Sequence, residues 1–319
     1  MSSTLLDMER SANHSASRQR EYITLPSRPV TEQPRGRVRR ITVAPRGYPP
    51  VDALVAVPEN SKGLTIYFIG FNQAMGSWEA AKCAQWAALS GTIVVACELP
   101  GFSRYGLPLS TQVRQDLLNG DPSSWGLTTW TYLKAAVEVS EIKVPDSIEI
   151  LAFSTGCSLA VSVLPAIQAS YEVSTLTLIE PVTLTTRTMG RLAIHNAADW
   201  VRLLKTVPKN YPTSWVRKAS LRQFWEPRLR FTPPDFLASV TMLAGDDTEW
   251  RVATLDLPKT HLVRASLSKL CPKQQFLDLD AHLEARDIPG ITCTITGFGH
   301  QWWHCLPAVD ALGRVLYSA

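Results

Sequence analysis

The chain has 319 residues, 45% hydrophobic and 19% charged, a balance typical of a globular protein with a sizeable core. Its net charge of +4 resides in the first 40 residues, which hold eight arginines and four acidic residues. The remaining residues are neutral in sum, which excludes a broad basic face for nucleic acid. No apolar run approaches the roughly 20 residues that span a bilayer.

The N-terminal segment, residues 1–37, mixes arginine, serine and acidic residues without a continuous apolar stretch. We expect a disordered basic arm there, and neither a secretory signal nor an organelle transit peptide.

Strands and helices alternate through the first half of the chain. The expected strands are 39–45, 51–58, 64–71, 92–102, 147–153 and 174–182, and the expected helices are 77–91, 125–139 and 158–170. This alternation predicts a mostly parallel, doubly wound sheet covered on both faces. Because no helix separates the first two strands, we expect them to pair as an antiparallel edge.

The pattern changes after residue 182, where two amphipathic helices rich in Trp and Arg are expected at 191–207 and 214–231. Alternation then resumes with a strand at 239–247, helical stretches at 261–270 and 274–285, a strand at 291–298 and a last helix at 307–318. The sequence therefore predicts an α/β core, residues 38–182 and 239–319, interrupted by an all-helical cap, residues 183–238.

The six cysteines are scattered, with no CxxC pair, and several lie in apolar runs. This distribution predicts buried free thiols in a reducing compartment, so we expect a cytoplasmic protein. The histidines show no metal-ligand spacing with a supporting carboxylate, and neither a metal nor another cofactor is expected.

The segment "AFSTGC" places Ser154 where a strand turns into a helix, with Ala152 and Gly156 two residues away on either side. Such a hinge needs small neighbours and lifts the central hydroxyl above the sheet, at a helix N-terminus that favours negative charge. A capping serine would also fit this hexapeptide taken alone.

Partners for a nucleophilic serine follow other strands. His300 lies in the glycine-bounded loop of "TITGFGHQWWH", and Asp246 and Asp247 end "TMLAGDD". "YFIGF" ends a strand at Gly70, so that the N–H of Phe71 is placed to face Ser154. All of these expected positions are carboxyl ends of strands, where an open parallel sheet binds its ligands.

Together these motifs resemble the α/β-hydrolase superfamily, in its serine-hydrolase form with a helical cap, over residues 38–319. "AFSTGC" is similar to the nucleophile elbow G-x-S-x-G, with Ala152 in place of the first glycine. "YFIGF" is similar to the His-Gly oxyanion loop, with Ile69 in place of the histidine, and "CELPGFSRYG" resembles the loop often written D-x-x-G-x-G-x-S. The order serine, acid, histidine also matches.

The resemblance implies a role for each position. Ser154 would be the nucleophile and His300 the base, while the N–H groups of Phe71 and Thr155 would bind the oxyanion. Asp247 is the first choice for the acid, because in this family the acid commonly lies two or three residues beyond the glycine of that turn. Glu180, at the end of the expected strand 174–182, is the main alternative, and Asp246 and Glu249 are the others.

Aromatic residues suggest the kind of substrate. Trp302 and Trp303 lie directly after His300, and with Gly70 we expect them to line a substrate pocket. The predicted function is hydrolysis of an ester or thioester with an apolar acyl part, through an acyl-enzyme on Ser154. Two alternatives stay open: the same triad in a biosynthetic acyl transfer, thioester release or lyase step, or a catalytically weak ligand-binding protein.

Overall fold

We describe a computed structural model of the chain, in which all residues are described except 1–17, 26–36, 72, 211–228, 246–247 and 318–319. Its strands are β1 (Gln19–Ile23), β2 (Arg37–Val43), β3 (Val51–Val57), β4 (Gly63–Phe68), β5 (Thr92–Cys97), β6 (Ser147–Phe153), β7 (Glu172–Ile179), β8 (Lys259–Ala265) and β9 (Ile291–Ile295). They form one sheet in the order β1-β9-β8-β7-β6-β4-β5-β3-β2. β3 runs antiparallel to both β2 and β5, and every other pair is parallel.

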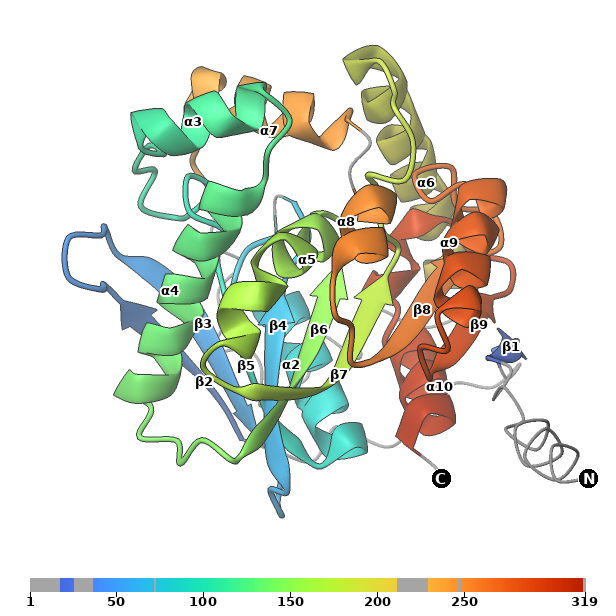
Figure 1. Ribbon diagram of the computed structural model, residues 1–319, viewed down its shortest axis with the longest axis horizontal. Helices are drawn as coiled ribbons and strands as arrows, with labels where there is room; N and C mark the ends of the chain where they lie inside the picture. Colours follow the sequence, from blue (N-terminus) through green and yellow to red (C-terminus); the bar gives the residue numbers. More distant parts are fainter. Residues whose placement is uncertain (1–17, 26–36, 72, 211–228, 246–247, 318–319) are drawn as a thin grey trace, which may run out of the picture.

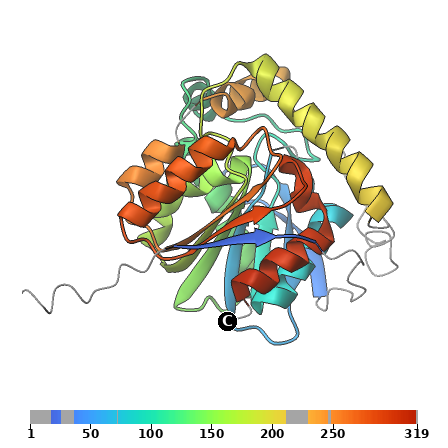
Figure 2. The same ribbon diagram turned by 90° about the vertical axis from the view of Figure 1, so that its right-hand side faces the viewer.

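Helices cover both faces of this sheet (Figure 1). They are α2 (Ser77–Ser90), α3 (Thr111–Leu118), α4 (Ser123–Val139), α5 (Thr155–Gln168), α6 (Met189–Asn210), α7 (Pro233–Leu243), α8 (Thr248–Thr254), α9 (Lys273–Ala285), α10 (Leu306–Tyr317) and the 3-10 helix η3 (His300–His304). α2 packs against α10 on one face, and α4, α5, α8 and α9 lie on the other (Figure 2). The predicted doubly wound α/β architecture and its antiparallel edge are confirmed.

Three helices lie beyond the carboxyl ends of the strands, at the top of Figure 1. α3 packs against α7, and α6 packs against both α7 and η3. α6 and part of α7 come from the region predicted as a cap, and they therefore cover the end of the sheet where the candidate site lies. Among the described residues, no helix is both long and apolar enough to cross a membrane.

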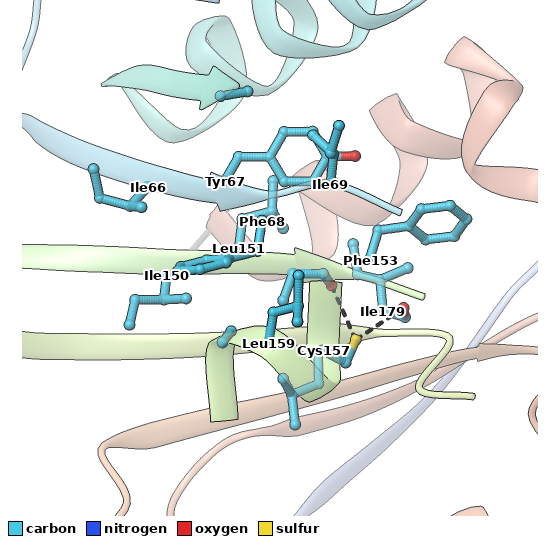
Figure 3. Close-up of a cluster of buried hydrophobic side chains, with 14 of the residues drawn as sticks. Ile66, Tyr67, Phe68, Ile69, Ile150, Leu151, Phe153, Cys157, Leu159 and Ile179 are labelled. Carbon is cyan, nitrogen blue, oxygen red and sulfur yellow. Dashed lines mark hydrogen bonds between the residues drawn. The ribbon is translucent and has the colours of Figure 1, made fainter. Parts of the chain in front are cut away.

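The core is built by strands that are buried along nearly their whole length. β4 and β6 contribute Ile66, Phe68, Ile150 and Leu151 to a buried cluster that also includes Leu159 and Cys157 of α5 (Figure 3). The Cys157 thiol donates hydrogen bonds to the carbonyls of Ala152 and Ile179. All six cysteines lie within the described residues, and they are buried and free, as predicted.

Two predicted elements in the second half of the chain are wrong. The expected strand 239–247 begins within α7, which starts where Thr232 accepts a hydrogen bond from the N–H of Asp235 and proline fills the first turn. The expected helix 261–270 overlaps strand β8, whose residues 260–265 are all buried. A continuous buried run carries no period that separates a strand from a helix.

The predicted disordered arm is also wrong for residues 19–23, which form β1 beside β9 at the edge of the sheet. Buried Arg18 donates its Nε hydrogen to Asp280 at 2.9 Å, and Arg20 reaches the other oxygen of the same carboxylate at 2.7 Å. Two arginines that appeared to belong to a solvated arm are therefore anchored to helix α9. Residues 1–17 and 26–36 of the predicted arm lie outside the described residues.

Candidate active site

Ser154 stands at the turn from β6 into α5 in a strained backbone conformation, with φ 55° and ψ −118°. Its N–H donates to the carbonyl of Ile179 at 2.8 Å, which ties the turn to β7. Gly156 permits the turn, because a Cβ at this position would lie 2.1 Å from the carbonyl oxygen of Phe68. The start of α5 is therefore packed directly on the end of β4, and Ser154 is held above the sheet as the sequence predicts for a nucleophile elbow.

Three side chains from three strand ends form a hydrogen-bonded chain. His300 Nε2 lies 2.9 Å from Ser154 Oγ, and His300 Nδ1 lies 3.0 Å from Oε2 of Glu180. Since a carboxylate only accepts, Nδ1 carries the hydrogen and Nε2 is left to accept from the serine hydroxyl. His300 is 1% exposed, and its ring stacks on Phe153 with centroids 5.3 Å apart. The arrangement is an imidazole held between a hydroxyl and a carboxylate.

Glu180 directly follows β7 and is completely buried. Its φ of 54° is also in the left-handed region, so both Ser154 and Glu180 occupy strained positions. Besides His300, the carboxylate accepts hydrogen bonds at Oε1 from the backbone N–H of Ala265 and, at 3.0 Å, from Nε1 of Trp302. Three donors thus hold a buried negative charge in one orientation.

The carboxylate that contacts His300 in the structure is not Asp247, the first choice for the acid made from sequence. Asp247 and Asp246 lie outside the described residues, and the expected strand that would have carried them overlaps helix α7 instead. The position beside His300 Nδ1 is occupied by Glu180, the alternative that the sequence left open.

The loop after β4 lies against the elbow. A Cβ on Gly70 would come within 2.8 Å of the Phe153 ring, so a side chain there would displace the residue that precedes the nucleophile. Among the described residues, no hydrogen bond uses the backbone N–H of Phe71 or of Thr155, the first residue of α5. Both N–H groups are therefore candidate oxyanion donors.

A chain of buried polar side chains, which was not predicted from the sequence, supports this loop. Gln73 Oε1 accepts the N–H of Gly70 at 3.1 Å, and Gln73 Nε2 lies 3.3 Å from Nε2 of His304. His304 Nδ1 lies 3.5 Å from the ammonium of Lys82, which pairs with Glu79. Burial, the nearby Lys82 and His300 hold the pKa of His304 well below its usual range. His304 is thus neutral, so one of its ring nitrogens is a donor and the other is an acceptor.

Helix α6 packs against η3, the turn that contains His300. Asn196 accepts a hydrogen bond from Gln301 at 2.8 Å, and Trp200 stacks on His304 with centroids 5.0 Å apart. Buried Asp199 pairs with Arg202 at 3.0 Å and fills the space beside Gly299, where a Cβ would lie 2.3 Å from its Oδ1. Burial raises the pKa of Asp199. The position of His300 therefore depends on a helix from the region predicted as a cap.

Trp302 and Trp303 do not form the open pocket wall expected from sequence. Both are completely buried, and their Nε1 hydrogens bond to Glu180 and to the Tyr67 hydroxyl, at 3.0 and 2.7 Å. Trp302 thus helps to hold the Glu180 carboxylate in place. Trp303 packs in the core against Trp86 and Phe153.

An aromatic cluster that the sequence analysis did not single out lies beside the candidate oxyanion loop instead. Phe71 contacts Phe102 and Phe236, with centroids 4.7 and 5.9 Å apart, and Phe231 contacts the latter two. Phe231 and Phe236 are 43% and 42% exposed, so the cluster presents an accessible apolar surface next to Phe71. The described residues contain no group of three or more His, Cys, Asp or Glu arranged to hold a metal ion.

The fold matches those of solved esterase structures at low sequence identity. Carboxyl esterase 2 from the fungus Tuber melanosporum is 15% identical with a TM-score of 0.53, covering 98% of this chain and 96% of its own. An esterase of the archaeon Pyrobaculum calidifontis is 20% identical with a TM-score of 0.50, covering 90% and 87%. A thermostable esterase from Pseudomonas putida is 16% identical with a TM-score of 0.50, covering 90% and 83%.

No protein-family model matches the sequence, and no curated protein does. At these identities the structural neighbours establish the architecture of the chain and nothing about its substrate.

Proposed function

We propose that this chain, which has the α/β-hydrolase fold, is a serine hydrolase that cleaves carboxylic esters or thioesters through an acyl-enzyme on Ser154. One observation carries the proposal: Ser154 Oγ, His300 and Glu180 are linked by contacts of 2.9 and 3.0 Å, with the serine at the tip of a strained elbow. This geometry matches what nucleophilic catalysis by serine requires.

In the first step, His300 Nε2 accepts the proton of Ser154 Oγ as the oxygen attacks the acyl carbonyl. The N–H groups of Phe71 and Thr155 receive the oxyanion, at the positively polarised N-terminus of α5. Glu180 holds the ring through Nδ1 and stabilises the imidazolium that forms. Asp247 has no part in this mechanism.

In the second step, His300 returns its proton to the departing alkoxide or thiolate, which leaves the acyl group on Ser154. A water molecule then gives a proton to the same nitrogen and attacks the acyl-enzyme, and the free acid and Ser154 are regenerated.

The aromatic cluster supports an apolar acyl group as the preferred substrate. Phe71 supplies a proposed oxyanion donor through its backbone, while its ring joins Phe102, Phe231 and Phe236. An acyl chain bound at Ser154 is expected to extend along this surface and to gain about 0.8 kcal/mol for each CH₂ that it buries. The six free thiols favour a reducing compartment such as the cytoplasm.

Hydrolysis of p-nitrophenyl esters of increasing chain length tests this function. Ser154→Ala should lower kcat/KM by about 10³-fold or more, and Ser162→Ala, a matched change on the same helix, should leave it within about twofold. Longer chains should be preferred up to the length of the aromatic surface. Undiminished turnover by Ser154→Ala, or no turnover of any ester by the folded protein, would refute the proposal.

A further inference from the structure

A second concave site lies away from the nucleophile, with a volume of about 480 Å³. It is lined by the segment that precedes and begins α6, by the residues after β8 and by the start of α9. Neither Ser154 nor His300 lines it. It borders the acid instead, because Ala265, whose N–H bonds to Glu180, directly precedes the lining residues Ser266 to Lys269.

The charged residues that line this site are all positive. Five cationic side chains line it, and none of the described lining residues is acidic; the five are Arg187, Arg191, Arg264, Lys269 and Lys273. Within the described part of the chain, no carboxylate lies within ion-pair distance of Arg191, Arg264, Lys269 or Lys273. The chain as a whole is nearly neutral beyond its first 40 residues, so this concentration of positive charge is local.

One of these cations is built into the fold. Arg264 is only 4% exposed, and it is held by two contacts of 3.3 Å to the carbonyl of Cys271 and by the ring of Phe276. Taking a guanidinium out of water without a carboxylate partner is costly unless another negative group is supplied. Half-buried Arg187 is likewise fixed, by the carbonyls of Val182 and Leu270 at 2.7 and 2.8 Å.

Burial and the positive charge of the site lower the pKa of a neighbouring histidine. His195, which lines the site from α6, has its pKa lowered by burial and then by Arg187 and Lys269. Positive charges in the site therefore repel a further positive charge, and an anion that binds there would reduce this repulsion.

The type of anion follows from the charge and the donors. Arginine forks bind planar or tetrahedral oxyanions at two oxygens, and the hydroxyls of Thr185, Thr186, Ser266 and Ser268 add polar groups to the lining. A monocarboxylate brings one negative charge to five cations, whereas linked phosphates bring several. Of the twelve lining residues, two have apolar side chains, Leu267 and Pro272.

We propose that this basic site binds a phosphate-bearing polyanion through Arg187, Arg191, Arg264, Lys269 and Lys273. The polyanion has two possible sources: the phosphates of a thioester substrate such as an acyl-coenzyme A, or a free polyphosphate bound independently of catalysis. The first source rests on the proposed function, whereas binding itself does not.

Calorimetric titration of the full chain with pyrophosphate, ATP and acetate at low ionic strength tests the site. The expected result is one-to-one binding of pyrophosphate and ATP, weakened by added salt, and at least tenfold weaker binding of acetate. The double variant Arg191→Glu/Lys269→Glu changes two exposed residues and should weaken pyrophosphate binding at least tenfold.

The matched control is Arg39→Glu/Lys205→Glu, which makes the same change in net charge at two exposed residues outside the site. It should bind pyrophosphate within about twofold of the wild type. Absence of binding to the folded wild type, or equal weakening in both double variants, would overturn the proposal.

Kinetics separate the two sources. If the site holds the phosphates of the substrate, Arg191→Glu/Lys269→Glu should raise the KM for butyryl-coenzyme A and leave that for p-nitrophenyl butyrate unchanged. If the polyanion is an independent ligand, the KM values for both substrates should be unchanged in the variant, while its pyrophosphate binding is lost. Calorimetry needs no turnover, so failure of the proposed function and failure of this site remain distinguishable.

Discussion

Trp302 Nε1 donates a hydrogen bond to Glu180 Oε1 at 3.0 Å, from a position only two residues after His300. One turn of 3-10 helix therefore contains both His300 and a hydrogen-bond donor to Glu180. The remaining oxygen of Glu180 is free to hold the His300 ring, at 3.0 Å. Glu180 thus has hydrogen bonds to two residues of the same short element, His300 and Trp302.

The identity of the acid is the first prediction. Glu180→Gln keeps the size of the side chain and removes the charge that stabilises the His300 imidazolium. It should lower kcat on p-nitrophenyl esters by about 10³–10⁴-fold with little change in KM. Asp247→Asn is the informative comparison, since it should leave kcat within about twofold. The opposite pattern would return the acid to Asp247.

The second prediction concerns Trp302. Trp302→Phe keeps an aromatic ring in the core and removes the donor to Glu180, so the buried carboxylate loses one of its three hydrogen bonds. Unfolding by urea should show a loss of about 1–3 kcal/mol. The fully folded variant should also have a kcat about tenfold lower, with KM unchanged. If only stability fell, Trp302 would have a packing role alone.

The third prediction concerns Gln73, which accepts the N–H of Gly70 at 3.1 Å. Gln73→Leu leaves that N–H without its acceptor and should loosen the loop that carries Phe71, lowering kcat about tenfold, a fraction of the ~10²–10³ that losing one oxyanion donor costs. Gln73→Glu keeps an acceptor at the same place and should recover most of the lost activity. Equal loss in both variants would show that Gln73 does not act through the Gly70 N–H.

The fourth prediction concerns pH and the loop after β5. Burial raises the pKa of Glu98 to about 7, and its Oε1 has no hydrogen-bond partner among the described residues. A carboxyl whose pKa is higher in the folded state than its ordinary 4.5 favours folding while protonated. That contribution is complete below about pH 4.5 and is lost as the pH rises through 7.

Glu98→Gln removes this dependence. The free energy of unfolding of the wild type, relative to the variant, should therefore fall between pH 4 and pH 8 by up to about 3 kcal/mol, given 1.36 kcal/mol for each pKa unit. Urea denaturation at both pH values measures it, with exposed Glu59→Gln as the control. A constant difference across this range would mean that Glu98 does not titrate there.

Much of the fold could be predicted because its elements have local signals. The alternation of apolar strands and helices up to residue 182 gave the parallel sheet, and small residues around Ser154 gave the elbow. β1 could not be predicted in this way, because Arg18 and Arg20 become structural only through Asp280, some 260 residues away. Such a long-range ion pair leaves no local pattern.

The candidate site was likewise predicted only in part. His300 and Ser154 follow strands with clear patterns, and the structure brings them together. The first choice for the acid, Asp247, depended on a strand expected at 239–247, and the structure has the end of helix α7 in that stretch. Trp302 was predicted to line a pocket because it is close to His300 in the sequence. The sequence does not show in which direction its side chain points, and in the structure the side chain is buried.

The most direct measurement is labelling of the intact protein with a fluorophosphonate, followed by mass spectrometry. We predict one adduct, on Ser154, which is absent in Ser154→Ala, strongly reduced in His300→Ala and Glu180→Gln, and unchanged in Asp247→Asn. A folded wild-type protein that takes up no label, or takes it up on a residue other than Ser154, would contradict the proposed function.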